Sequence, residues 1–186
     1  MRIRDASDTA SWEQFTDIYG PLVFRYGRKH GLQEADAADL VQEVLREVSQ
    51  AIERFEYDAQ VGKFRSWLFT IARYALSNQY RRKKRQPIGS GDENVGEMLE
   101  QLPSKVDDQD YWDRQYEQQL FQWAVEQIRP QFHESTWKAF WLTAVDGEKA
   151  AVVAKRLELS VGSVYVAKNR VLKRLQAKIS QIDDDK

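Results

Sequence analysis

The chain contains no cysteine, so it can form neither a disulfide nor a thiolate metal site. It also lacks any apolar run close to the roughly 20 residues that a membrane-spanning helix needs. Acidic side chains begin at Asp5, where a secretory signal would be apolar, and we therefore expect a cytoplasmic protein. The two histidines, His30 and His133, lie far apart with no metal or nucleophile signature nearby, and there is no glycine-rich phosphate loop. These absences predict that the protein is not an enzyme and uses no metal or other cofactor.

An excess of one charge is also missing, because the net charge of the whole chain is only -1. This balance conceals a segregated pattern, since residues 91–120 hold nine acidic and two basic residues while both flanking parts are mildly basic. Segregated charge of this kind is compatible with binding a nucleic acid at either end of the chain.

Helical periodicity dominates the chain on both sides of this acidic segment. Apolar residues recur at helical spacing from Ser11, from Asp36 to about Phe55, and from Phe64 to Arg85. Pro21 lies inside the first pattern and is expected to kink or break that helix, and Gly31 is expected to end it. The prediction is an all-α protein with two small helical domains, residues 1–86 and 116–186.

The segment between them, residues 87–115, is expected to be a flexible acidic linker. It combines dense Asp and Glu with several Gly and Pro, and it has no apolar periodicity. We expect the second domain to open with a helix from about Tyr116 to Arg129, which Pro130 ends.

The predicted helix 64–85 has two contrasting faces. Its apolar half is opposed by a stripe of hydroxyl and guanidinium groups that contains no carboxylate, and a basic run, residues 81–85, follows it. Such a surface could lie against the phosphates of a nucleic acid. An amphipathic core helix followed by a solvated charge run would give the same pattern.

Residues 150–175 have the pattern of a helix-turn-helix. Apolar residues occupy the positions at which two such helices must pack, with the small Ala154 at their closest crossing. Glu158 stands at the turn, where a left-handed backbone favours glycine, and Ser160 is suited to cap the second helix. A generic helical hairpin is the alternative interpretation, which the fit at six packing positions and the cap disfavours.

The second helix of this motif is the one that enters the major groove of DNA. Its candidate DNA-reading residues are Ser163, Tyr165, Lys168, Asn169 and Arg170. Asparagine and arginine can each make two hydrogen bonds to a base edge. Candidate phosphate contacts, which position a protein without reading sequence, are Lys155, Arg156, Lys173 and Arg174.

Three motifs in this order resemble the small two-domain sigma factors of bacterial RNA polymerase, the extracytoplasmic-function group. Residues 39–44, Asp-Leu-Val-Gln-Glu-Val, look like the region-two helix signature of that family, and residues 64–73 look like its next helix. Residues 148–175 look like its region-four helix-turn-helix. The resemblance covers nearly the whole chain outside the linker and the first few residues.

The resemblance implies a sigma factor that binds core RNA polymerase and directs promoter-specific initiation. The region-two helix would dock on the β′ clamp helices through Asp39, Gln42, Glu43 and Arg46. Region four would contact the β flap and recognise the minus-thirty-five element. Recognition and melting of the minus-ten element would involve Tyr57, Asp58, Lys63, Arg65, Arg73, Asn78, Arg81 and Arg82. An anti-sigma factor or another signalling partner is also implied.

Two other classes of protein compete with this interpretation. A stand-alone helix-turn-helix regulator would carry a sensor or dimerisation domain at its N-terminus, but such a domain needs no polar docking face that leads into an aromatic and basic helix. An adaptor that holds polymerase without reading DNA would not need Asn169 and Arg170 on its second helix.

Overall fold

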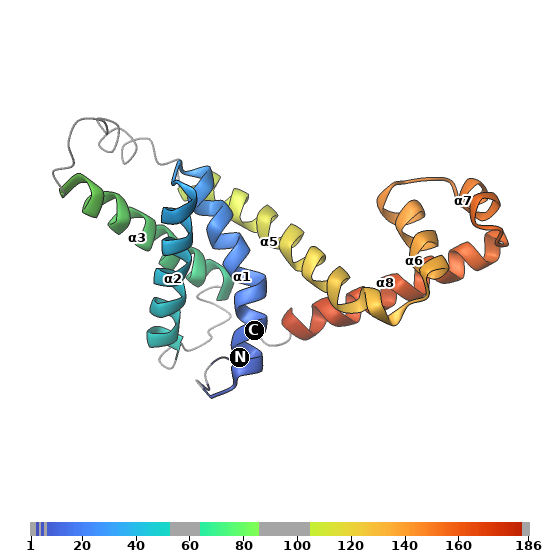
Figure 1. The fold of residues 1–186 in the computed structure, drawn as a ribbon, viewed down its shortest axis with the longest axis horizontal. Helices are drawn as coiled ribbons and strands as arrows, with labels where there is room; N and C mark the ends of the chain where they lie inside the picture. Colours follow the sequence, from blue (N-terminus) through green and yellow to red (C-terminus); the bar gives the residue numbers. More distant parts are fainter. Residues whose placement is uncertain (1–2, 4, 6, 53–63, 86–104, 184–186) are drawn as a thin grey trace. The chain divides into compact units, whose positions relative to one another are not determined.

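The computed structural model describes residues 3, 5, 7–52, 64–85 and 105–183. All regular secondary structure in these residues is helical (Figure 1), which confirms the all-α class. The chain divides into an N-terminal unit that ends at Gln119 and a C-terminal unit that begins at Leu120.

The N-terminal unit begins with α1, Thr9–Lys29, and α2, Glu34–Ala51, which pack against each other. The carboxylate of Asp8 caps α1 by accepting a hydrogen bond of 3.0 Å from the Ser11 backbone N–H. Gly31 ends the helix with a φ of 82°, as its sequence position predicts. Gly27 allows the close approach of the two helices, because a Cβ there would lie 3.1 Å from Leu40 Cδ2.

Pro21 does not break α1, contrary to expectation, and the helix runs through it. Proline has no N–H, so it leaves the carbonyl of the residue four positions earlier, Asp17, without its helical donor. The side chain of Gln119 supplies the missing hydrogen bond, with its Nε2 3.2 Å from the Asp17 carbonyl oxygen. A distant part of the chain therefore compensates for the proline.

The third helix, α3, spans Phe64–Arg85, as the sequence predicts, and packs against α2. The next helix, α5, spans Lys105–Ile128 and so begins about three turns before its expected start at Tyr116. Residues 105–115 are helical rather than linker, and the first domain extends to Gln119 instead of residue 86. The rest of the predicted linker lies outside the described residues.

Aromatic packing explains why the first half of α5 belongs to the N-terminal unit. Trp112 is fully buried, with its ring centroid 5.6 Å from the rings of both Tyr26 on α1 and Phe69 on α3. One turn later, Tyr116 stacks on Tyr19 at 5.6 Å. Burying these large rings stabilises the helical conformation of this acidic segment.

The C-terminal unit contains the end of α5, a 3-10 turn at Arg129–Gln131, α6 (Glu134–Phe140), a π-helical turn at Trp141–Val145, α7 (Ala150–Leu157) and α8 (Val161–Asp183). Helices α6 and α7 both pack on α8 (Figure 1). Their shared core consists of Ala139, Val153, Ala154, Val164 and Ala167, with Leu157 and Leu159 packed against it.

The two helices and the turn of the predicted motif lie where the sequence indicates. Glu158 adopts the left-handed conformation with φ 56°, the only non-glycine residue with a positive φ in the described part of the chain. For a residue with a Cβ this conformation costs about 1 kcal/mol. The Ser160 hydroxyl accepts a hydrogen bond of 3.0 Å from the Ser163 N–H and so caps α8.

Candidate nucleic-acid and polymerase interfaces

The predicted polymerase-binding residues lie together on α2. Asp39, Gln42 and Arg46 are exposed, while Glu43 is half-buried. Glu43 forms ion pairs with Arg82 on α3 and, at 3.8 Å, with Arg46 on its own helix. The structure therefore joins one residue of the predicted polymerase face to one residue of the predicted DNA face.

The predicted DNA-binding residues of α3 fall into two groups. Arg81 and Arg82 are exposed and Asn78 is half-buried. Arg65 and Arg73, in contrast, are directed toward α5 and are paired with its carboxylates. Arg65 Nε lies 2.8 Å from Asp113 Oδ1, and its guanidinium lies 4.9 Å from the centre of the Tyr116 ring. The structure thus separates two of the predicted arginines from the open surface of α3.

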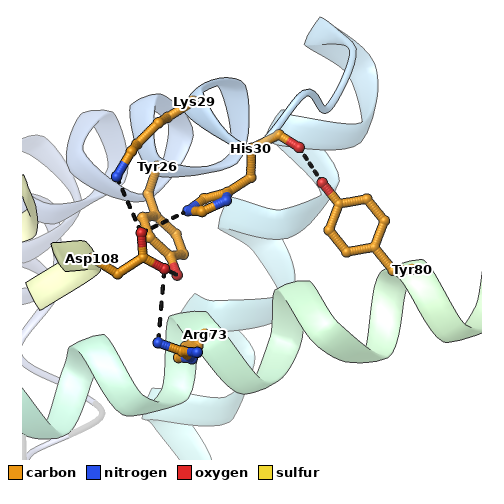
Figure 2. Close-up of polar contacts among 6 residues, drawn as sticks. All are labelled: Tyr26, Lys29, His30, Arg73, Tyr80 and Asp108. Atoms are coloured by element: carbon orange, nitrogen blue, oxygen red, sulfur yellow. Dashed lines mark hydrogen bonds and ion pairs between the residues drawn. The ribbon is translucent and has the colours of Figure 1, made fainter. Parts of the chain in front are cut away.

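Asp108 occupies the centre of a buried polar cluster (Figure 2). Its carboxylate is fully buried. One oxygen lies 3.1 Å from Lys29 Nζ and 3.2 Å from His30 Nε2. The other oxygen accepts a hydrogen bond of 3.1 Å from the Tyr26 hydroxyl and lies at ion-pair distance, 3.8 Å, from Arg73. This cluster connects α5 to both α1 and α3, and sequence reasoning missed it because Asp108 lies in an acidic segment that has the composition of a linker.

Burial lowers the pKa of His30, and the nearby Asp108 carboxylate opposes this shift only in part. The hydroxyl of Tyr80 donates a hydrogen bond to the His30 backbone carbonyl and so holds the backbone at this residue (Figure 2). Desolvation also raises the pKa of Tyr26, and Asp108 adds to this effect, so the Tyr26 hydroxyl remains a donor at neutral pH.

The depressed pKa of His30 makes stability dependent on pH. In the unfolded chain, His30 becomes protonated as the pH falls below its ordinary pKa of about 6.5. In the folded chain its pKa is lower, so protonation favours the unfolded state. The contribution of His30 to stability should therefore be full above about pH 6.5 and should be lost on acidification. Urea unfolding from about pH 8 to about pH 5 should show this loss, and His30→Gln should reduce the slope. The exposed His133→Gln serves as control, and an unchanged slope in His30→Gln would contradict the assignment.

Three predicted minus-ten residues, Tyr57, Asp58 and Lys63, lie outside the described residues. One residue that sequence reasoning did not select is Tyr74 on α3, whose side chain is 64% exposed. It lies one turn before Asn78 and two turns before Arg81, on the open side of the helix. An aromatic residue in an amphipathic helix resembles core in sequence, so only its exposure could have identified it.

The five candidate reading residues of α8 differ in how open they are. Tyr165, Asn169 and Arg170 are exposed and Lys168 is half-buried. Ser163 is exposed, but its hydroxyl lies 2.8 Å from that of Ser160 in the helix cap. The Arg170 guanidinium lies 5.8 Å from the centre of the Phe132 ring, which holds it at the side of the helix.

The four candidate phosphate-binding residues are all exposed. Arg156 pairs with Glu148 at 2.8 Å, and Arg174 donates a hydrogen bond of 2.8 Å to Gln131. Exposed pairs of this kind contribute only about 0–1 kcal/mol, so they can exchange for phosphate contacts. Among the described residues, Lys155 and Lys173 form no ion pair.

An apolar groove of about 970 Å³ lies in the C-terminal unit between α5, α6 and α7. Trp137 and Trp141 form part of its wall, with ring centroids 6.0 Å apart. Three cationic side chains, Arg129, Lys138 and Arg156, border it. Within the described ranges, no helix is long and apolar enough to cross a membrane, and no three His, Asp or Glu side chains are grouped as metal ligands.

Comparison with known proteins gives a family match to the first part of the chain. Residues 16–86 match the family described as Sigma-70 region 2. A search of curated proteins found no match. Among solved structures, the chain is similar to one described as "Structure of CnrH in complex with the cytosolic domain of CnrY", with 20% identity, a TM-score of 0.36, and coverage of 98% of this chain and 93% of that chain.

The match covers most of α1 and all of α2 and α3, and α2 and α3 carry the predicted polymerase-binding residues and the described part of the predicted minus-ten residues. The sequence motifs in residues 39–44 and 64–73 fall inside this match. Residues 16–86 of this chain are therefore similar to sigma-70 region 2, in agreement with the sequence motifs that resemble a sigma factor.

Proposed function

We propose that the chain is a sigma factor of the extracytoplasmic-function group, which binds core RNA polymerase in the cytoplasm and directs it to specific promoters. The observation that carries this proposal is the family match of residues 16–86, followed in the chain by the helix–turn–helix of α7 and α8. The role is that of an initiation factor with no chemical step of its own.

Polymerase binding is assigned to the exposed side of α2. This surface presents Asp39, Gln42 and Arg46 beside Glu43, a mixture of both charges that suits a polar partner helix. The resemblance to the family supports the β′ clamp helices as that partner. The ion pair between Glu43 and Arg82 would then adjust the charge of the docking face from the adjacent helix.

Reversing the charge of Glu43 should weaken polymerase binding. Glu43→Lys places a cation beside Arg46 and Arg82, so we expect at least a tenfold loss of affinity, about 1.4 kcal/mol, in a titration with core polymerase. Glu13→Lys makes the same charge change on the exposed surface of α1 and should leave the affinity unchanged. Equal affinities for wild type and Glu43→Lys would remove Glu43 from the interface.

Contact with the minus-ten element is assigned to the open side of α3. Arg81 and Arg82 supply positive charge for phosphates, Asn78 supplies an amide, and the exposed ring of Tyr74 offers a surface for stacking an unpaired base. Tyr57, Asp58 and Lys63 in the preceding segment remain candidates from the resemblance. Arg65 and Arg73 could contact DNA only after leaving Asp113 and Asp108, so we assign them to the packing of α5.

The minus-thirty-five element is assigned to α8. Tyr165, Asn169 and Arg170 are directed outward at its N-terminal part, with Ser163 and Lys168 beside them, and Lys155 and Lys173 flank this surface. Substituting Arg170 with alanine should lower affinity for the cognate element by about 1–3 kcal/mol. Fluorescence anisotropy with cognate and scrambled duplexes checks this, and equal losses on both would make Arg170 a phosphate contact.

Further protein contacts are assigned to the C-terminal unit. The apolar groove beside Trp137 and Trp141 has the size and lining of a site for a helix or loop of a protein partner. We assign it to the polymerase β flap, which the family resemblance implies. The same resemblance implies an anti-sigma factor or another signalling partner.

Transcription by purified core polymerase from the native host tests the proposal as a whole. The reaction is run on sheared genomic DNA with and without the chain, and the RNA 5′ ends are sequenced. New start sites that depend on the chain and share two spaced upstream elements are expected. Polymerase that ignores the chain, while the chain alone binds particular DNA, would favour the stand-alone regulator.

A further inference from the structure

We propose that Val166, with Tyr165 beside it, forms an apolar patch on α8 that contacts the C5 methyl group of a thymine in the upstream promoter element. This inference rests on the proposed function, because it requires α8 to lie in the major groove. It adds a specificity-determining residue of a different chemical kind from the polar side chains that the sequence selects.

The first observation is a concentration of exposed apolar side chains in the helix-turn-helix. Of the seven exposed large hydrophobic residues in the described part of the chain, four lie in α7 or α8: Val152 (49%), Val161 (42%), Tyr165 (55%) and Val166 (68%). Single exposed apolar residues need no explanation, but a group of them on one short motif marks a binding surface.

The second observation is that Val166 is not needed for the core. The inner face of α8 is made by Val164, Ala167 and Val171, which are at most 8% exposed. Val166 lies three and four residues before Asn169 and Arg170, so the three side chains share one outer face of the helix. An apolar side chain next to an amide and a guanidinium matches the mixed chemistry of base edges.

The chemistry of the major groove indicates what this patch would contact. The only methyl group there belongs to thymine, and asparagine pairs best with adenine, the partner of thymine. Val166 and Asn169 stand about one turn apart, so they can read the methyl and the adenine of one A·T pair or of neighbouring pairs. The exposed cations Lys155 and Lys173 favour a polyanion over an apolar protein surface at this patch.

The test measures binding of the chain, assembled with core polymerase, to promoter duplexes found by transcription mapping. Each thymine of the upstream element is replaced in turn by deoxyuridine, which lacks only the C5 methyl. At one or two positions the wild-type affinity should fall about fourfold, the factor expected for losing one buried methyl-sized group. Val166→Ala should bind the thymine promoter more weakly and lose this sensitivity, whereas the exposed Val145→Ala should retain it.

Each other outcome contradicts the inference in a recognisable way. Specific binding without methyl sensitivity, or equal sensitivity in wild type and Val166→Ala, overturns the thymine contact and leaves the sigma function intact. If Val166→Ala weakens assembly with polymerase rather than binding to the promoter, the patch contacts protein instead. Absence of any promoter-specific binding overturns both the inference and the proposed function.

Discussion

Replacing Asp108 with alanine should destabilise the N-terminal unit by about 3 kcal/mol, the lower end of the range for breaking a buried charge pair. The carboxylate is fully buried and faces Lys29, His30, Arg73 and the Tyr26 hydroxyl, so its removal leaves two cations, an imidazole and a hydroxyl without their common partner. The lower end applies because Lys29 and Arg73 are each 27% exposed and can regain some hydration.

Urea unfolding of the full chain, followed by circular dichroism, measures this loss. Asp110→Ala removes a carboxylate from the exposed side of the same helix and should change stability by less than about 0.5 kcal/mol. Asp108→Asn keeps the shape but not the charge and should lie between the two. If Asp108→Ala matched Asp110→Ala, the cluster would be no stronger than a solvated ion pair.

Replacing Trp112 with alanine should have an equal or larger effect, about 3–5 kcal/mol. The indole is fully buried between rings of α1 and α3, so the substitution leaves a cavity. The other contacts between α1, α3 and α5 hold these helices in place, so they cannot move together to fill it. The variant Val106→Ala is the matched control, because it shortens a side chain of the same helix that is 69% exposed.

Truncated chains provide an independent measurement of the same packing. A fragment that ends at Gln119 should unfold cooperatively, and Trp112→Ala should destabilise it as much as it destabilises the full chain. A fragment that ends at residue 104 lacks Asp108, Trp112 and Tyr116 and should be much less stable. Equal stability of the two fragments would show that the first half of α5 is dispensable for the N-terminal unit.

Local chemistry accounts for the parts of this protein that its sequence predicts well. Helix α3 has the predicted bounds because its apolar spacing is regular and no Gly or Pro interrupts it. Gly31 ends α1 and Ser160 caps α8, since both signals act within a few residues. The left-handed turn at Glu158 was also predictable, although glycine is the usual residue there, because the packing positions on both sides place this residue at the turn of the motif.

Contacts between distant parts of the chain account for what the sequence did not reveal. Composition marks residues 105–115 as linker, and only the packing of Trp112 against the rings of Tyr26 and Phe69 explains why this segment is helical. Pro21 remains inside a helix because Gln119, from another helix, satisfies the carbonyl that it leaves free. Periodicity identifies a helix face, but it contains no information about which partner covers that face.

The functional surfaces divide in the same way. The sequence by itself determined that the first part of the chain is similar to sigma-70 region 2 and that the last part has the pattern of a helix-turn-helix, because both depend on residue types at fixed spacing. The tertiary structure alone decided which candidate side chains are accessible to a partner. Carboxylates of α5 form ion pairs with Arg65 and Arg73, whereas Tyr74 and Val166 are exposed. The physical reason is that exposure and ion pairing depend on the neighbouring helix, whose position no local pattern records.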